Sequence, residues 1–212
     1  MNYSQLSTLI QDYCESTEQS FVANIPTFVQ LAEERIYNSV QIPAIRKNVT
    51  GTMTNTFPYF QLPDDWLSTF SLAVIDPVTG EYEYLINKDV NFIRAAYQPP
   101  NSTGKPQYYA IFDKNTFILG PTPDSNYQVE LHYYYYPQSI VTASTSWLGD
   151  NFETVLLYGT LREAYIYMKG EQDMMQYYEQ KYQEALALLK RLGDGLDRQD
   201  AYRSGQARIA VT

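Results

Sequence analysis

Cysteine and histidine are almost absent from this chain of 212 residues, which has one of each, Cys14 and His132. A lone cysteine excludes a disulfide framework within the chain. One cysteine with one histidine cannot supply the three or four ligands of the usual zinc sites. We therefore expect no metal site and no cofactor. Cys14 is expected to be a partly buried thiol, because no histidine or asparagine arrangement supports a nucleophile.

Basic residues and long apolar runs are also scarce. The 15 lysines and arginines face 24 acidic residues, a net charge of −9. Such a surface disfavours bulk binding of nucleic acid, since phosphate contacts need Lys and Arg. No apolar run approaches the ~18 residues of a membrane span. Residues 1–20 lack the basic start and apolar core of a signal peptide, so we expect a protein that is not secreted and has no membrane partner.

Sequence signatures of catalysis are missing as well. The chain contains no GxGxxG, P-loop, GxSxG or HExxH pattern. Asp64 and Asp65 are adjacent in LPDDWL, which suits a helix N-terminus better than the paired carboxylates of a glycosidase. We expect no catalytic residue, with a weak glycosidase using Asp64 or Asp65 as an alternative.

Tyrosine, by contrast, is abundant: 21 residues, against nine phenylalanines and two tryptophans. Its large apolar ring and polar tip suit protein interfaces. The same residues are also common on half-buried strands. Both interpretations stay open for the set as a whole.

The hydrophobic pattern predicts helices, then strands, then helices. Helical spacing predicts helices over residues 3–14 and over about 26–40, the second beginning with Pro26 in its first turn. From Lys47 to Tyr136 the period is two, with frequent turns, and Tyr127–Tyr136 is the longest strand. Several short strands with such turns favour an antiparallel sandwich or barrel.

The helical period returns at Asp150. The helix expected over about 171–192 carries a heptad-like stripe, which favours packing on another helix of the same chain over a dimer zipper. The residues of this seam are Met175, Tyr178, Tyr182, Ala185, Leu189 and Leu192.

The expected architecture is α+β, with a helical bundle built from both chain ends and an inserted antiparallel β domain. The expected parts are residues 1–46 (N-terminal helices), 47–146 (β-rich domain), 147–192 (C-terminal helices) and 193–212 (an extended tail). The tail contains three glycines and equal numbers of aspartate and arginine. Its few apolar residues do not offset the ~1–2 kcal/mol cost of ordering each residue, so we expect order only on a partner.

Four segments, taken in order, resemble the head-to-tail adaptor (connector) proteins of tailed bacteriophages, especially short-tailed ones. They are LAEERIYNSVQIPAIRKNVTG (31–51), LPDDWL (62–67), GKPQYYAIFDKNTFILGPTPDSNYQVELHYYYYP (104–137) and WLGDNFETVLLYGTLREAYIYMKGEQDMMQYYEQKYQEAL (147–186). The likeness covers most of the chain between Leu31 and Leu186.

The resemblance implies a structural virion protein without enzymatic activity. Such proteins form a ring, typically of twelve copies, between the portal and the tail tube or nozzle at the head-tail junction. The helices lie on the portal side, the β region faces the tail, and DNA passes through without being read. On this basis we expect the tail to dock on the portal. The residues expected to carry this docking are Arg198, Tyr202, Arg203, Arg208 and Ile209.

A carbohydrate-binding β module of a phage tail fibre is the alternative. Tyrosines stacked on a β surface can hold the faces of sugars. The long flanking helices have no task in such a module, and only two tryptophans are present. The sequence therefore favours the adaptor.

Overall fold

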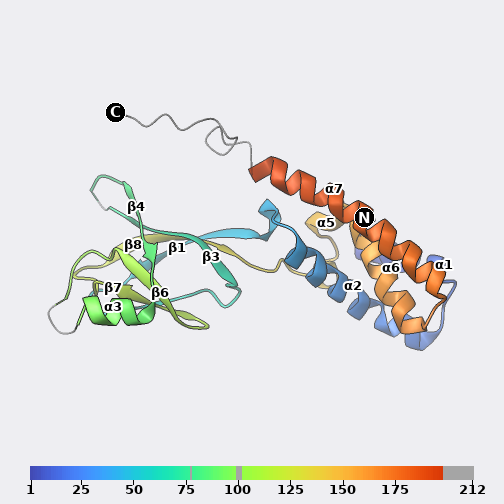
Figure 1. Cartoon of the computed structure of the whole chain (residues 1–212), viewed down its shortest axis with the longest axis horizontal. Coiled ribbons are helices and arrows are strands. Elements are labelled where there is room, and N and C mark those ends of the chain that lie inside the picture. The colour runs from blue at the N-terminus through green and yellow to red at the C-terminus, as the bar shows by residue number, and fades with distance from the viewer. Residues whose placement is uncertain (77, 99–101, 198–212) are drawn as a thin grey trace. The chain divides into compact units, whose positions relative to one another are not determined.

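The computed structural model describes residues 1–76, 78–98 and 102–197. Within them the chain forms two compact units (Figure 1). The helical unit combines residues 1–45 with the described residues from Tyr136 onward, and the strand unit is Arg46–Tyr135. This described part contains seven α-helices and two sheets, which confirms the α+β prediction.

The helical unit is organised around its helix α6. Its elements are α1 (Tyr3–Cys14), α2 (Gln19–Ser39), the short 3-10 helix η1 (Pro43–Ile45), α4 (Ile140–Ala143), α5 (Trp147–Asn151), α6 (Glu153–Met168) and α7 (Gln172–Asp197). Helix α6 packs against α1, α2 and α7 (Figure 1). Helix α1 begins with a capping box, in which the Asn2 side chain and the Gln5 side chain each accept the other residue's backbone N–H.

Helix α2 begins earlier than the sequence predicts. It starts at Gln19, and Pro26 lies inside it rather than in its first turn. An interior proline removes one helical hydrogen bond and costs about 3 kcal/mol. Phe21 and Ile25, which precede Pro26 in the same helix, are buried. Their burial offsets the cost, so packing decides where this helix begins.

Helix α7 ends later than the sequence predicts. The sequence predicts an end near Leu192, but the helix continues through Gly193 and Gly195 to Asp197. A Cβ atom at residue 193 would lie 2.5 Å from the carbonyl oxygen of Gln41. Glycine at this position therefore permits close packing of the helix on a neighbouring backbone rather than ending it.

The strand unit contains two four-stranded sheets and one helix. Its elements are β1 (Arg46–Met53), β2 (Tyr59–Gln61), β3 (Ser68–Ile75), β4 (Tyr82–Tyr84), β5 (Ile86–Asn87), α3 (Val90–Ala96), β6 (Tyr108–Asp113), β7 (Thr116–Gly120) and β8 (Tyr127–Tyr134). The strand orders are β1-β8-β3-β4 and β2-β7-β6-β5. These pairings do not close a barrel among the described residues, so the barrel alternative was wrong.

The two sheets share one hydrophobic core. Along β8 the side chains alternate, and Val129, Leu131 and Tyr133 are buried, as the period of two predicts. They meet Phe117 and Leu119 of the other sheet. The opposite face of that second sheet is covered by α3, whose Ile93 packs on residues of β6 and β7.

The segment after the last strand belongs to the helical unit. Residues 136–146 were expected in the β-rich domain, but the strand unit ends at Tyr135. The carboxylate of Glu33 on α2 accepts the backbone N–H of Ile140 at 3.0 Å, and the Ser139 side chain also hydrogen-bonds to it. These contacts hold the start of α4 on α2.

Candidate interaction surfaces

The adjacent carboxylates Asp64 and Asp65 are not arranged as an acid/base pair. The Asp65 carboxylate accepts a hydrogen bond from the Lys47 ammonium and another from the buried Tyr133 hydroxyl, each at 2.8 Å. The hydrogen bond from Lys47 is the main cause that lowers the pKa of Asp65. An ionised carboxylate held by two donors joins β1 to β8 and the turn before β3. This arrangement gives Asp65 a structural role.

His132 and Cys14 belong to different units of the chain. The His132 side chain is 40% exposed on β8, with Nε2 3.5 Å from Oε1 of Glu130. Burial raises the pKa of the Cys14 thiol to about 11, so it stays protonated at neutral pH. No cluster of His, Cys, Asp and Glu in residues 1–76, 78–98 and 102–197 could hold a metal ion.

Helix α7, which carries the predicted seam, packs against α6 of the same chain. Tyr178, Tyr182, Ala185 and Leu189 are buried. Met175 is half-buried, and Leu192 is 38% exposed. The sequence pattern did not include Leu186, which is buried beside them.

A glycine on α6 allows this close packing. A Cβ atom at Gly159 would lie 3.2 Å from the ring of Tyr182 and 3.3 Å from the Cβ of Ala32. Helices α2, α6 and α7 therefore meet at one point, and the apolar stripe is used inside the molecule. The contact joins a glycine of α6 to the Tyr182 ring of α7, so the sequence pattern of one helix alone does not predict it.

The tail residues singled out by the sequence lie outside the described part of the chain. These are Arg198, Tyr202, Arg203, Arg208 and Ile209.

Many tyrosines and phenylalanines of the strand unit are exposed. On the outer face of the first sheet, the Arg46 guanidinium lies 4.9 Å from the Phe70 ring centre and 5.7 Å from that of Tyr134. Tyr82 and Tyr84 on β4 are 48% and 68% exposed. Tyr109 and Tyr133 are instead buried in the core. The tyrosines thus divide between both interpretations, and the exposed ones offer apolar area to other chains.

A second group of rings lies on the outer face of the other sheet. Phe57, Tyr59 and Phe112 contact one another in a row, with ring centres 5.7 and 5.2 Å apart. Arg94 of α3 lies 5.4 Å from the Phe112 ring centre. Phe57 is 53% and Phe112 is 40% exposed. Exposed aromatic rings beside arginine are typical of protein interfaces.

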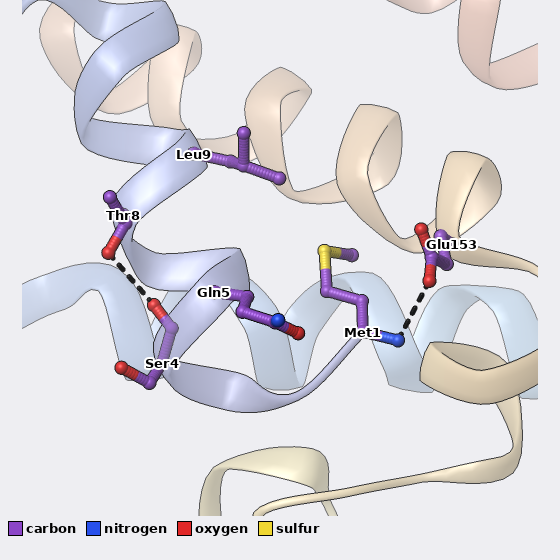
Figure 2. A pocket seen from close by; sticks show the side chains of 6 residues that line it. All are labelled: Met1, Ser4, Gln5, Thr8, Leu9 and Glu153. Carbon is purple, nitrogen blue, oxygen red and sulfur yellow. Dashed lines mark hydrogen bonds and ion pairs between the residues drawn. The ribbon is translucent and has the colours of Figure 1, made fainter.

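The helical unit carries an open groove beside α1 (Figure 2). It has a volume of about 500 Å³ and is lined by residues of α1 together with Met1 and Glu153. The Met1 amino group forms an ion pair with Glu153 at 2.8 Å, visible as a dashed line in Figure 2. The remaining lining side chains, Ser4, Gln5, Thr8 and Leu9, are polar or aliphatic. The groove therefore offers one ion pair and several side chains that can form hydrogen bonds.

The exposed aromatic rings and the open groove offer surfaces for contacts with other molecules. The family model described as "SU10 adaptor protein" matches residues 1–210, and the chain belongs to this family of phage adaptor proteins. No curated protein matches the chain. A phage adaptor is a component of the virion and assembles with phage head and tail components. None of the described helices is long and apolar enough to cross a membrane.

Proposed function

We propose that this protein is a head-to-tail adaptor that forms a ring, with twelve copies, between the portal and the tail tube or nozzle. The observation that carries the proposal is the match to the adaptor family over residues 1–210. The division into two compact units supports it, because a ring protein joining two different structures needs two separate sets of contacts. We assign the helical unit to the portal side and the strand unit to the tail side.

The ring would surround the path of the DNA at the head-tail junction. The chain has a net charge of −9, and residues 1–45 contain five carboxylates and one arginine, Arg35. An acidic channel wall repels DNA phosphates and lets the genome pass without being held. Neutralising acidic residues that line the channel should slow DNA ejection, and unchanged ejection would contradict this part of the proposal.

The last 15 residues would dock on the portal. Residues 198–212 carry three arginines and one aspartate, opposite in sign to the rest of the chain. Because α7 continues to Asp197, deleting residues 198–212 leaves the described helix intact. We expect this deletion to weaken portal binding, measured by co-sedimentation with portal rings. Changing Arg198, Arg203 and Arg208 together to Gln is the matched variant of unchanged length, and wild-type binding by both variants would overturn the docking.

The central test is the mass of the purified chain, alone and mixed with portal rings from the same phage, by light scattering. We expect a small species alone and a complex containing one ring of copies on each portal. A chain that does not join the portal at any salt concentration would overturn the proposal. Glycan binding together with no portal association would favour the carbohydrate-binding alternative.

A further inference from the structure

The first sheet of the strand unit has two open edges. Its order is β1-β8-β3-β4, so β1 and β4 each pair with one strand only among the described residues. All three residues of β4 are exposed, as are Lys47, Asn48, Val49 and Thr50 on β1. Open edges present unpaired backbone groups that another strand can bond.

The edge of β1 has no proline and no bulge, two of the usual protections against such pairing, and its charged residues are Arg46 and Lys47 at one end. All eight of its residues pair with β8. Proteins normally shorten, bulge or interrupt an exposed edge of this length. A groove of about 320 Å³ lies beside β1 and is lined by residues 49–52, 54, 57 and 59–63. A long regular edge of this kind can be extended by a strand from another chain.

Strand β4 has the direction that such a contact needs. Strand β8 is antiparallel to β1 and to β3, and β3 is antiparallel to β4. A copy of β4 placed at the edge of β1 in another molecule would therefore be antiparallel to it. The sheet would continue from one molecule into the next without a change of pattern.

The faces of the two strands also match. Residues that lie directly opposite each other on neighbouring strands point to the same face of a sheet. Tyr84 of β4 lies opposite Ala73 of β3, Ala73 lies opposite Glu130 of β8, and Glu130 lies opposite Thr50 of β1. Tyr82 and Tyr84 therefore share the outer face with Asn48, Thr50 and Thr52 of β1. Glu83 shares the inner face with Lys47, Val49 and Gly51.

Charge favours the same pairing. The only charged residues of β1 are Arg46 and Lys47. The charged residues of β4 and of the position before it are Glu83 and Glu81. Within the chain Lys47 pairs with Asp65 and Glu83 pairs with Lys105, and both Lys47 and Glu83 remain about half exposed. Opposite charges on the two edges steer the approach of one edge to the other.

We propose that β4 of one copy pairs, antiparallel, with the free edge of β1 in the next copy, so that the sheets of neighbouring subunits form one continuous sheet. This contact joins two different surfaces, and such head-to-tail contacts close into rings by rotation. The inference rests on the proposed function, because it identifies the surfaces that would join the subunits of the proposed ring.

Disulfide trapping tests the pairing. In a Cys14→Ser background, Tyr84→Cys is combined in turn with Asn48→Cys, Thr50→Cys and Thr52→Cys, all on the outer face. The matched control combines Tyr84→Cys with Val49→Cys, which points to the inner face. Within one molecule β1 and β4 are three strand spacings apart, roughly 14 Å, beyond the ~7 Å limit for a disulfide. Any bond must therefore join two molecules.

Each variant is oxidised with and without portal rings and run on a non-reducing gel. We expect at least one outer-face pair to convert the monomer into a ladder of oligomers, and the control pair to remain monomeric. Ring formation on the portal is measured separately by light scattering. Thermal unfolding of each reduced variant confirms that it folds.

The outcomes separate this inference from the function on which it rests. Rings with no outer-face ladder would overturn the strand pairing and leave the adaptor function. A ladder with no portal association would support the pairing and count against the adaptor function. Neither rings nor ladder would overturn both. Equal ladders from the control pair, or a dimer from Thr50→Cys alone, would overturn the pairing, because they indicate random or symmetric contact.

Discussion

The two units handle a carboxylate in opposite ways. Glu33 of the helical unit is 3% exposed, and burial raises its pKa. Asp65 of the strand unit is partly exposed, and its bond to Lys47 lowers its pKa. The helical unit thus encloses a carboxylate that fixes a chain connection, while the strand unit keeps the carboxylate of Asp65 and its Lys47 partner partly exposed. Burial is therefore the main influence on the pKa of Glu33, whereas a hydrogen bond to a lysine is the main influence on the pKa of Asp65.

The chain provides a probe for each unit. Its two tryptophans are Trp66 in the strand unit and Trp147 in the helical unit. Trp66 contacts the Phe117 ring, and Trp147 stacks on Phe152. Variants Trp147→Phe and Trp66→Phe therefore report the unfolding of one unit each by fluorescence.

The largest effect is expected from Phe117→Ala. Phe117 is fully buried between Trp66 and Tyr109. Loss of the ring leaves a cavity and should lower the free energy of unfolding of the strand unit by about 3–5 kcal/mol. Urea unfolding followed by Trp66 measures it, with the exposed Phe57→Ala as a control that changes little. An equal shift in the Trp147 transition would show that the units unfold together and would break the comparison.

The next effect distinguishes two glycines of α7. Gly193→Ala places a Cβ atom 2.5 Å from the Gln41 carbonyl oxygen, whereas Gly195→Ala meets nothing within 4 Å. We expect Gly193→Ala to destabilise the helical unit by about 1–3 kcal/mol. Gly195→Ala should stabilise it by up to about 1 kcal/mol through helix propensity. The same sign for both, in urea unfolding followed by Trp147, would contradict close packing at Gly193.

Acid should affect the two carboxylates in opposite directions. The stabilisation from Asp65 is present above its unfolded pKa of about 3.9 and is lost as the pH falls through its lowered folded pKa. The stabilisation of the folded state by Glu33 is fully present below its unfolded pKa of about 4.3 and is lost as the pH rises through its raised folded pKa. The two groups therefore give pH slopes of opposite sign.

The measurement compares each variant with the wild type by thermal unfolding between pH 3 and 7. Asp65→Asn should make the Trp66 transition less sensitive to acid. Glu33→Gln, which keeps an acceptor for the Ile140 N–H, should raise the Trp147 midpoint at pH 7 and have less effect at pH 4. The exposed Glu34→Gln is its control. A lower midpoint for Glu33→Gln at pH 7 would contradict the cost assigned to burial of the charge.

The smallest effects are expected at two tyrosines in the helical unit. The Tyr178 side chain hydrogen-bonds to Tyr165, whereas the buried Tyr182 hydroxyl has no hydrogen-bond partner among the described residues. Tyr178→Phe should cost about 0.5–1.5 kcal/mol, and Tyr182→Phe should be neutral or slightly stabilising. Thermal unfolding followed by Trp147 compares them, and a larger loss for Tyr182→Phe would reverse the assignment.

The hydrophobic periodicity of the sequence correctly predicts the helices and strands that bury the side chains of one face. The helix over residues 3–14 and the alternating strand from Tyr127 are found with nearly the expected bounds. Both are stabilised by a pattern that lies within one element. The family resemblance was also readable from ordered segments, and the family match confirms it.

The misplaced boundaries depend on contacts between distant segments. Pro26 and Gly193 have clear local preferences, which the burial of Phe21 and Ile25 and the approach of Gln41 override. The free edges of β1 and β4 could not be predicted, because an edge is defined by the order of strands in a sheet. Sequence patterns give the strands but not their neighbours.

The insertion of the strand unit has a consequence for synthesis. Helix α2 is complete before the strand unit is translated, but its packing partner α6 follows the whole of Arg46–Tyr135. At a translation rate of about 5–20 residues per second, on the order of 10 s pass between the synthesis of α2 and that of α6. During that time Phe21 and Phe28 lack the Tyr167 ring of α6, which they contact in the folded chain. We therefore expect nascent chains to be prone to aggregation through α2 until α6 emerges.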